Sequence, residues 1–124
     1  MLNIKNIDDL NLEEFDFNGI ILTMISLNLK DIFIGSIVKL VVNSNNIILA
    51  KNYNKNLSIS NEIKAKIIEM EIGELLTSIK VSAFNNTFTA ITTTKQAKQL
   101  NFQINNDVSI LVKASQFAIK KVIK

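Results

Sequence analysis

Short apolar stretches broken by Asn-rich turns recur along all 124 residues, and this pattern limits what the chain can fold into. The stretches are rich in Ile, Val, Phe and Thr, and none keeps helical spacing long enough to form a helical bundle. Two turn dipeptides, Asn18-Gly19 and Asn85-Asn86, separate pairs of such stretches, and both tolerate the positive φ angles of a tight hairpin. The sequence therefore predicts an all-β protein.

The two predicted hairpins lie about 67 residues apart, and a second similarity has nearly the same offset. The apolar pattern of residues 38–45 recurs at 108–115. An internal repeat is the simplest explanation. Because the polar, turn-prone stretch 52–56 separates the copies, we place a first repeat at 1–55 and a second at 56–124.

The two copies differ at their first strand and near their middle. Residues 62–70 predict an opening strand in the second copy, whereas the first copy begins near the middle of that element. Only the second copy has a segment, 92–100, that predicts a short helix. We therefore expect the first β-barrel to lack its opening strand. An open sheet edge is normally covered by another segment or chain, which predicts a homo-oligomer.

The composition excludes several classes of function. The absence of Cys and His rules out thiolate nucleophiles, imidazole bases and the usual zinc sites. All fourteen cationic residues are Lys, so the chain lacks the guanidinium fork of many phosphate and base-edge readers. A net charge of +3 spread along the chain favours small anions over nucleic acid. The acidic pairs at 8–9 and 13–14 are predicted to be surface charge, because neighbours on a strand point to opposite faces.

Two polar segments at strand ends are the basis of the functional prediction. Lys113-Ala114-Ser115 ends an apolar strand, and Ser58-Ile59-Ser60-Asn61 opens another. Brought together, they supply one positive charge and several short hydrogen-bond donors, which is what a small dianionic oxyanion needs. Two plainer interpretations stay open, with Lys113 a solvent-exposed lysine and 58–61 a polar turn. Asn43-Ser44-Asn45, at the equivalent place in the first copy, is predicted to be a loop.

Residues 57–119 resemble the molybdenum-pterin-binding family, whose Mop or TOBE domains occur in molbindins, molybdate-responsive regulators and some transporter ATPases. Family members open with a Ser-Ala-Arg-Asn strand, continue through a hairpin to an Ala-Ile-Thr strand, and end in a Lys-Ala-Ser strand. The first copy is similar but degenerate, so the resemblance implies a tandem Mop protein. The matching residues are Ser58-Ile59-Ser60-Asn61, Ile63 with Ala65-Lys66-Ile67, Ala90-Ile91-Thr92 and Lys113-Ala114-Ser115.

The resemblance implies two tandem OB-like barrels with at most one short helix. It also implies a non-enzymatic protein that binds molybdate or tungstate for storage or homeostasis, at repeat interfaces within a homo-oligomer. The family's name adds molybdopterin as a candidate ligand. Ser60 stands where the family has Arg, and Lys95 is a candidate source of the replacing charge. The implied oxyanion-binding residues are Ser58, Ser60, Asn61, Thr92, Lys95, Lys113, Ala114 and Ser115.

The address of the protein and two alternative functions complete the sequence-based expectations. Charge appears within the first nine residues, unlike in a signal peptide, and no apolar run reaches the length of a membrane span. We therefore expect a cytoplasmic protein that makes no membrane contact. The main alternative function is an OB-type nucleic-acid or protein-interaction module whose anion site has decayed. A regulatory domain detached from a transporter ATPase is the other.

Overall fold

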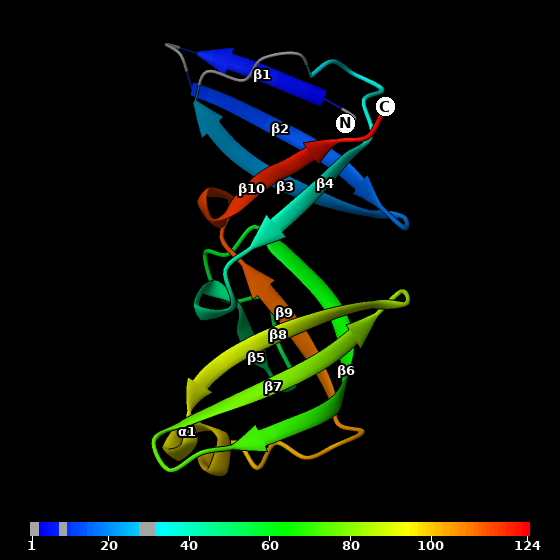
Figure 1. The fold of residues 1–124 in the computed structure, drawn as a ribbon. Coiled ribbons are helices and arrows are strands. Elements are labelled where there is room, and N and C mark those ends of the chain that lie inside the picture. The colour runs from blue at the N-terminus through cyan, green and yellow to red at the C-terminus, as the bar shows by residue number, and fades with distance from the viewer. Residues whose placement is uncertain (1–2, 8–9, 28–31) are drawn as a thin grey trace. The chain divides into compact units, whose positions relative to one another are not determined.

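The computed structural model describes residues 3–7, 10–27 and 32–124, and the chain forms two compact units (Figure 1). Neither unit is one continuous stretch of chain. Unit 1 comprises Met1–Val42, Ile59–Asn61 and Val112–Lys124, and unit 2 comprises Asn43–Ser58 and Glu62–Leu111.

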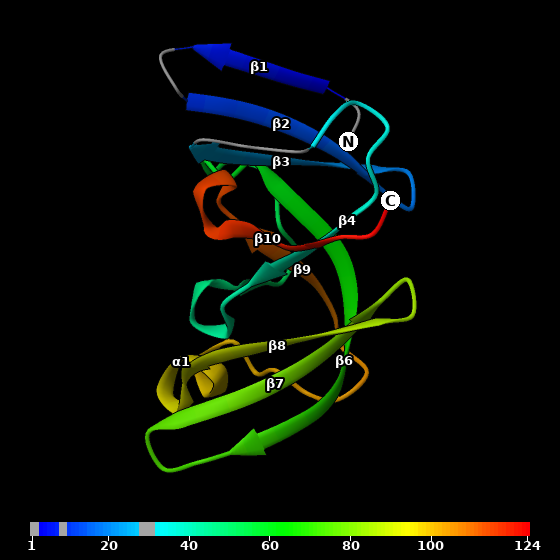
Figure 2. The same ribbon diagram turned by 45° about the horizontal axis from the view of Figure 1, so that its top comes forward.

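Unit 1 contains a three-stranded antiparallel sheet and a separate two-stranded ladder. The order in the sheet is β1-β2-β3, and β4 pairs with β10 in the ladder, where Figure 2 shows them side by side. The predicted turn at Asn18-Gly19 joins β2 to β3, with φ angles of +51° and +90°. The strands are β1 (Asn3–Ile7), β2 (Leu10–Phe17), β3 (Ile20–Leu27), β4 (Val38–Val42) and β10 (Phe117–Val122).

Strand β1 is short and lies at the edge of the three-stranded sheet of unit 1. Its five residues pair with β2 from Asn3 opposite Glu14 to Ile7 opposite Leu10. Strand β6 (Asn61–Ile72), most of which belongs to unit 2, has twelve residues. That the first repeat lacks its opening strand stays a prediction.

Unit 2 is a five-stranded sheet in the order β5-β9-β6-β7-β8. Its core consists of β-branched and aliphatic side chains such as Ile67, Ile79 and Ile110, each at most 1% exposed. The expected short helix is α1 (Thr94–Gln99), and the Thr93 hydroxyl caps it by accepting the Gln96 N–H at 3.1 Å. The remaining strands are β5 (Ile48–Ala50), β7 (Leu76–Ala83), β8 (Asn86–Thr93) and β9 (Asp107–Val112). The predicted all-β class with one short helix is confirmed for the described residues.

The turn of the β7–β8 hairpin lies one residue earlier than predicted. Its two central residues are Phe84 and Asn85, with φ angles of +50° and +62°, rather than Asn85 and Asn86. Asn86 is instead the first residue of β8, opposite Ala83. Its side-chain Nδ2 donates a hydrogen bond to the Phe84 carbonyl at 3.0 Å. Because the register of the ladder places these two positions in the loop, Phe84 adopts a left-handed conformation that its side chain does not favour.

Two 3-10 turns lead the chain between the units. Strand β4 in unit 1 continues through η1 (Ser44–Asn46) into β5 in unit 2, and β9 in unit 2 continues through η2 (Ala114–Gln116) into β10 in unit 1. Strand β5 then pairs with β9, and β10 pairs with β4. Each strand-turn-strand segment therefore contributes one strand to each unit.

The prediction of surface charge at 13–14 is wrong for Glu13, which is fully buried. The alternation of β2 places Asn11, Glu13 and Phe15 on its covered face, and the Ser26 hydroxyl on β3 donates a hydrogen bond to Glu13 Oε1. Burial raises the pKa of the Glu13 carboxyl, and the Ser26 hydrogen bond opposes this only in part. The acidic pair at 8–9 lies outside the described residues.

Candidate functional site

The side chain of Asn61 ties the start of β6, directly after Ser60, to β3. Asn61 is the first residue of β6 and is 1% exposed. Its Oδ1 accepts the Thr23 N–H at 2.7 Å, and its Nδ2 donates to the Thr23 carbonyl at 2.8 Å. Ser60, immediately before it, is exposed. Both polar atoms of the Asn61 carboxamide are thus hydrogen-bonded to one backbone unit of β3, whereas Ser60 is exposed to solvent.

The Lys113-Ala114-Ser115 segment forms the start of η2. Lys113 is the N-cap residue with extended backbone, φ −69° and ψ 146°, and no side chain caps the turn. The Lys113 carbonyl accepts the Gln116 N–H at 3.0 Å, while its exposed ammonium forms no hydrogen bond or ion pair with the described residues. Ala114 is buried and Ser115 is exposed, so the small residue anchors a turn that presents polar groups outward.

Strand β3 unites these two segments. Asn61 is hydrogen-bonded to it, and η2 contacts it, as the position of the turn before β10 in Figure 2 also shows. Five of the eight predicted residues, Ser60, Asn61 and 113–115, therefore belong to unit 1. Sequence reasoning missed Thr23, because the groups it contributes are backbone atoms that leave no residue-type signal.

The other three predicted residues, Ser58, Thr92 and Lys95, belong to unit 2. Thr92 is half-buried in β8, a strand that contacts η1, and Lys95 is exposed on α1. The hydroxyl of Thr94 donates to the Gly73 carbonyl at 2.7 Å, which ties the start of α1 to the far end of β6. Ser58 precedes the opposite end of that strand. The structure therefore does not bring Lys95 together with Ser58.

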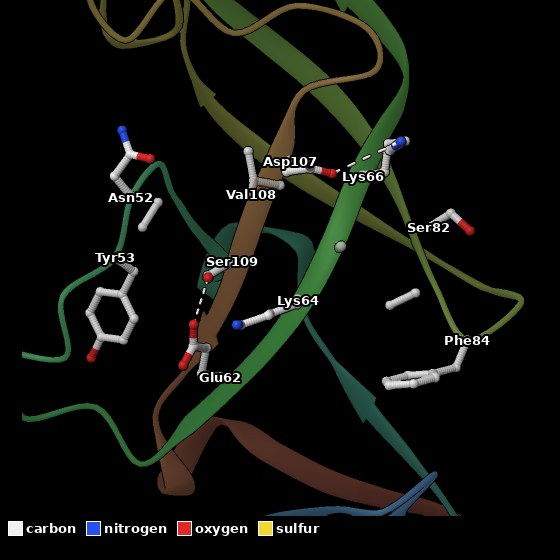
Figure 3. A pocket seen from close by; sticks show the side chains of 13 residues that line it. Asn52, Tyr53, Glu62, Lys64, Lys66, Ser82, Phe84, Asp107, Val108 and Ser109 are labelled. Carbon is white, nitrogen blue, oxygen red and sulfur yellow. Dashed lines mark hydrogen bonds and ion pairs between the residues drawn. The ribbon is translucent and has the colours of Figure 1, made fainter.

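Unit 2 also contains an open groove of about 580 Å³ across β6, β7 and β9 (Figure 3). The buried Ser109 hydroxyl donates to Glu62 Oε2 at 2.6 Å, and Lys66 lies 4.0 Å from Asp107 at the exposed edge. With Lys64, the lining holds two lysines and two carboxylates, so its charges cancel. None of the eight predicted residues lines it. Its chemistry does not favour an anion.

Two further classes of site find no support in the described part of the chain. No three acidic side chains there gather closely enough to hold a metal ion. Within the same residues, the single α-helix falls far short of the length and apolarity that a bilayer crossing needs.

The fold is that of OB-like barrels, with curled antiparallel sheets and a short helix between β8 and β9 of unit 2. The sequence matches no family model and no curated protein. Among solved structures, the chain is similar to ModG, described as a cytoplasmic molybdate-binding protein, in a crystal form with molybdate bound. The TM-score is 0.86 at 16% identity, over 94% of this chain and 87% of ModG. At that identity the likeness shows a shared fold.

Proposed function

We propose that this chain is a tandem Mop protein that binds molybdate or tungstate without catalysis, in the cytoplasm, for storage or homeostasis. One observation supports this most strongly. Lys113, whose ammonium has no partner among the described residues, is the N-cap of the uncapped turn η2. This turn contacts β3, the same strand to which Asn61, next to Ser60, is hydrogen-bonded. The similarity to ModG adds support for the ligand class. Molybdopterin is retained as a further candidate ligand.

The tandem organisation, with repeats at 1–55 and 56–124, is part of the proposal. It is supported by two pairs of elements at near-equal offsets, the hairpins β2–β3 and β7–β8 and the turns η1 and η2. We assign Ser60, Lys113, Ala114 and Ser115 to one half of an oxyanion site. Thr92 and Lys95, from unit 2 of another copy in a homo-oligomer, form the other half. Ser58, at the opposite end of β6 from Lys95, lies outside that half.

A site of this kind holds a tetrahedral dianion with donors and a positive field, and no bond is made or broken. Hydroxyl and ammonium donors favour a fully deprotonated oxyanion over hydrogen phosphate, whose proton needs an acceptor. Sulfate is disfavoured by its smaller size. Each charge-assisted hydrogen bond contributes roughly 1.5–3 kcal/mol. After ordering costs of several kcal/mol, five such bonds leave about 8 kcal/mol, which corresponds to roughly micromolar affinity.

Titration calorimetry tests the proposal with molybdate, tungstate, sulfate and phosphate. We expect heats with the first two only. Lys113→Ala is expected to weaken molybdate binding about tenfold to a hundredfold, the size of one lost charge-assisted bond, while the protein stays folded. Lys98→Ala removes an exposed lysine from α1 in unit 2 and serves as the matched control. Salt-sensitive binding of an oligonucleotide with no molybdate heat would instead favour the nucleic-acid module.

Light scattering tests the assembly, because the proposed site is completed by a second copy. We expect a homo-oligomer, and a strictly monomeric chain would leave only half of the proposed ligand set at any site. Lys95→Ala tests the supplementary charge, since its removal should weaken molybdate binding in the oligomer.

A further inference from the structure

We infer that Asn61 is a positioning residue, which sets the place of Ser60 and of the β6 opening on β3, rather than an oxyanion ligand. The effect on anion binding rests on the proposed function. The clamp, by which we mean the two hydrogen bonds between the Asn61 side chain and the Thr23 backbone, is a property of the protein without ligand. The reason is that both polar atoms of the side chain are already used, at 2.7 and 2.8 Å, by the backbone of Thr23.

The geometry of the clamp is that of a missing strand. In an antiparallel ladder, residues alternately point both backbone groups toward one neighbour and then toward the other side. Thr23 lies opposite Glu14 on β2, and β3 is an edge of the three-stranded sheet. Because the Thr23 N–H and carbonyl both bond Asn61, they point away from β2. A single carboxamide thus satisfies the two groups that a neighbouring strand would otherwise pair.

Burial makes this clamp consequential. Asn61 is 1% exposed and Thr23 is half-buried, so removing the Asn61 side chain leaves two backbone groups of Thr23 without these partners in a part-buried place. The same removal releases Ser60 from β3, while η2 keeps its own contact with that strand. Ser60 and the Lys113 turn would then no longer both be held against β3.

Three variants separate positioning from ligation. Asn61→Ala removes both hydrogen bonds. Asn61→Asp keeps an acceptor for the Thr23 N–H but removes the donor to its carbonyl, and it adds a charge that repels an anion. Thr23→Ala is the matched control, because it removes the side chain of Asn61's partner but leaves the Thr23 backbone groups that Asn61 bonds. Ile79→Val, in the core of unit 2, controls for a general loss of stability.

Two measurements on the full chain are needed, molybdate affinity by calorimetry and amide exchange at Thr23 without ligand. For Asn61→Ala we expect faster exchange at Thr23 and about tenfold weaker molybdate binding, the size of one or two lost hydrogen bonds. Asn61→Asp should lose more, and both controls should keep the wild-type affinity. An affinity loss with unchanged Thr23 exchange would show that the bonds to Thr23 do not position the site, and that result overturns the inference.

The outcomes also separate this inference from the proposed function. If wild-type protein gives no molybdate heat, the proposed function fails and the role of Asn61 in anion binding fails with it, whatever the exchange data show. If wild type binds and Asn61→Ala accelerates Thr23 exchange without weakening binding, the clamp is purely structural and only the inference fails.

Discussion

The two 3-10 turns have nearly the same backbone but different ways of satisfying it. The N-cap of η1, Asn43, has φ −66° and ψ 137°, and that of η2, Lys113, has φ −69° and ψ 146°. In η1 the Asn43 side chain accepts the Asn45 N–H at 2.9 Å, whereas in η2 no side chain does so. The residue at the N-cap therefore decides the character of the turn. Asn43 caps η1 with its own side chain, whereas Lys113 leaves the N–H donors of η2 uncapped and adds a cation.

The hairpins of the two units differ in a similar way. When the turns β2–β3 and β7–β8 are aligned, the buried Glu13 of unit 1 falls at the position of Ile79 in unit 2. The isoleucine packs in an apolar core, while the carboxyl needs the Ser26 hydroxyl and has one oxygen, Oε2, without a partner in the described residues. Unit 1 thus combines the half of the proposed site that contains Lys113 with a buried carboxyl, whereas unit 2 has an apolar side chain at the aligned position.

Exchanging the N-cap residues of the turns is the strongest way to break the comparison. Lys113→Asn should convert η2 into a self-capped turn without a cation, and Asn43→Lys is its matched counterpart in η1. Losing one charge-assisted bond is worth roughly 1.5–3 kcal/mol, so Lys113→Asn should weaken molybdate binding about tenfold to a hundredfold by calorimetry. Asn43→Lys should leave that site unchanged. Equal effects of the two variants would mean that the turns are not functionally distinct.

Removing the buried carboxyl sharpens the comparison of the hairpins. Because burial raises the folded-state pKa of Glu13, the folded protein binds more protons at this group than the unfolded chain does. The contribution of the protonated Glu13 carboxyl to the stability of the fold is complete below the ordinary pKa of about 4.5. It is lost as pH rises through the higher pKa that this carboxyl has in the folded protein. The free energy of unfolding of Glu13→Gln minus that of the wild type should therefore increase as pH rises through this range.

Urea unfolding of both proteins between about pH 4 and pH 8 provides the measurement. The exposed Glu71 supplies the control, since Glu71→Gln should keep the wild-type pH profile. A difference between wild type and Glu13→Gln that stays constant with pH would contradict a buried carboxyl with a raised pKa.

The fold class was predictable from the sequence because strand alternation and Asn-rich turns are local signals. The Asn18-Gly19 turn is confirmed, since both residues favour the conformation that the register requires. Glu13 was missed because charge predicts exposure, whereas strand register decides which face is covered. The role of Thr23 could not be predicted at all, because its contact with Asn61 joins backbone atoms to a residue 38 positions away.

The smallest expected effect concerns the second hairpin, where Phe84 stands at the position of Asn18 in the first. Both have φ near +50°, but only Asn tolerates this conformation well. Phe84→Asn should therefore stabilise unit 2 by about 1 kcal/mol, measured by urea unfolding, against Phe88→Leu in the adjacent strand as the control. The half-exposed ring lines the groove of unit 2, so some packing is lost as well. A destabilised Phe84→Asn would mean that this packing outweighs the backbone strain, and that the two hairpins satisfy their turns by different means.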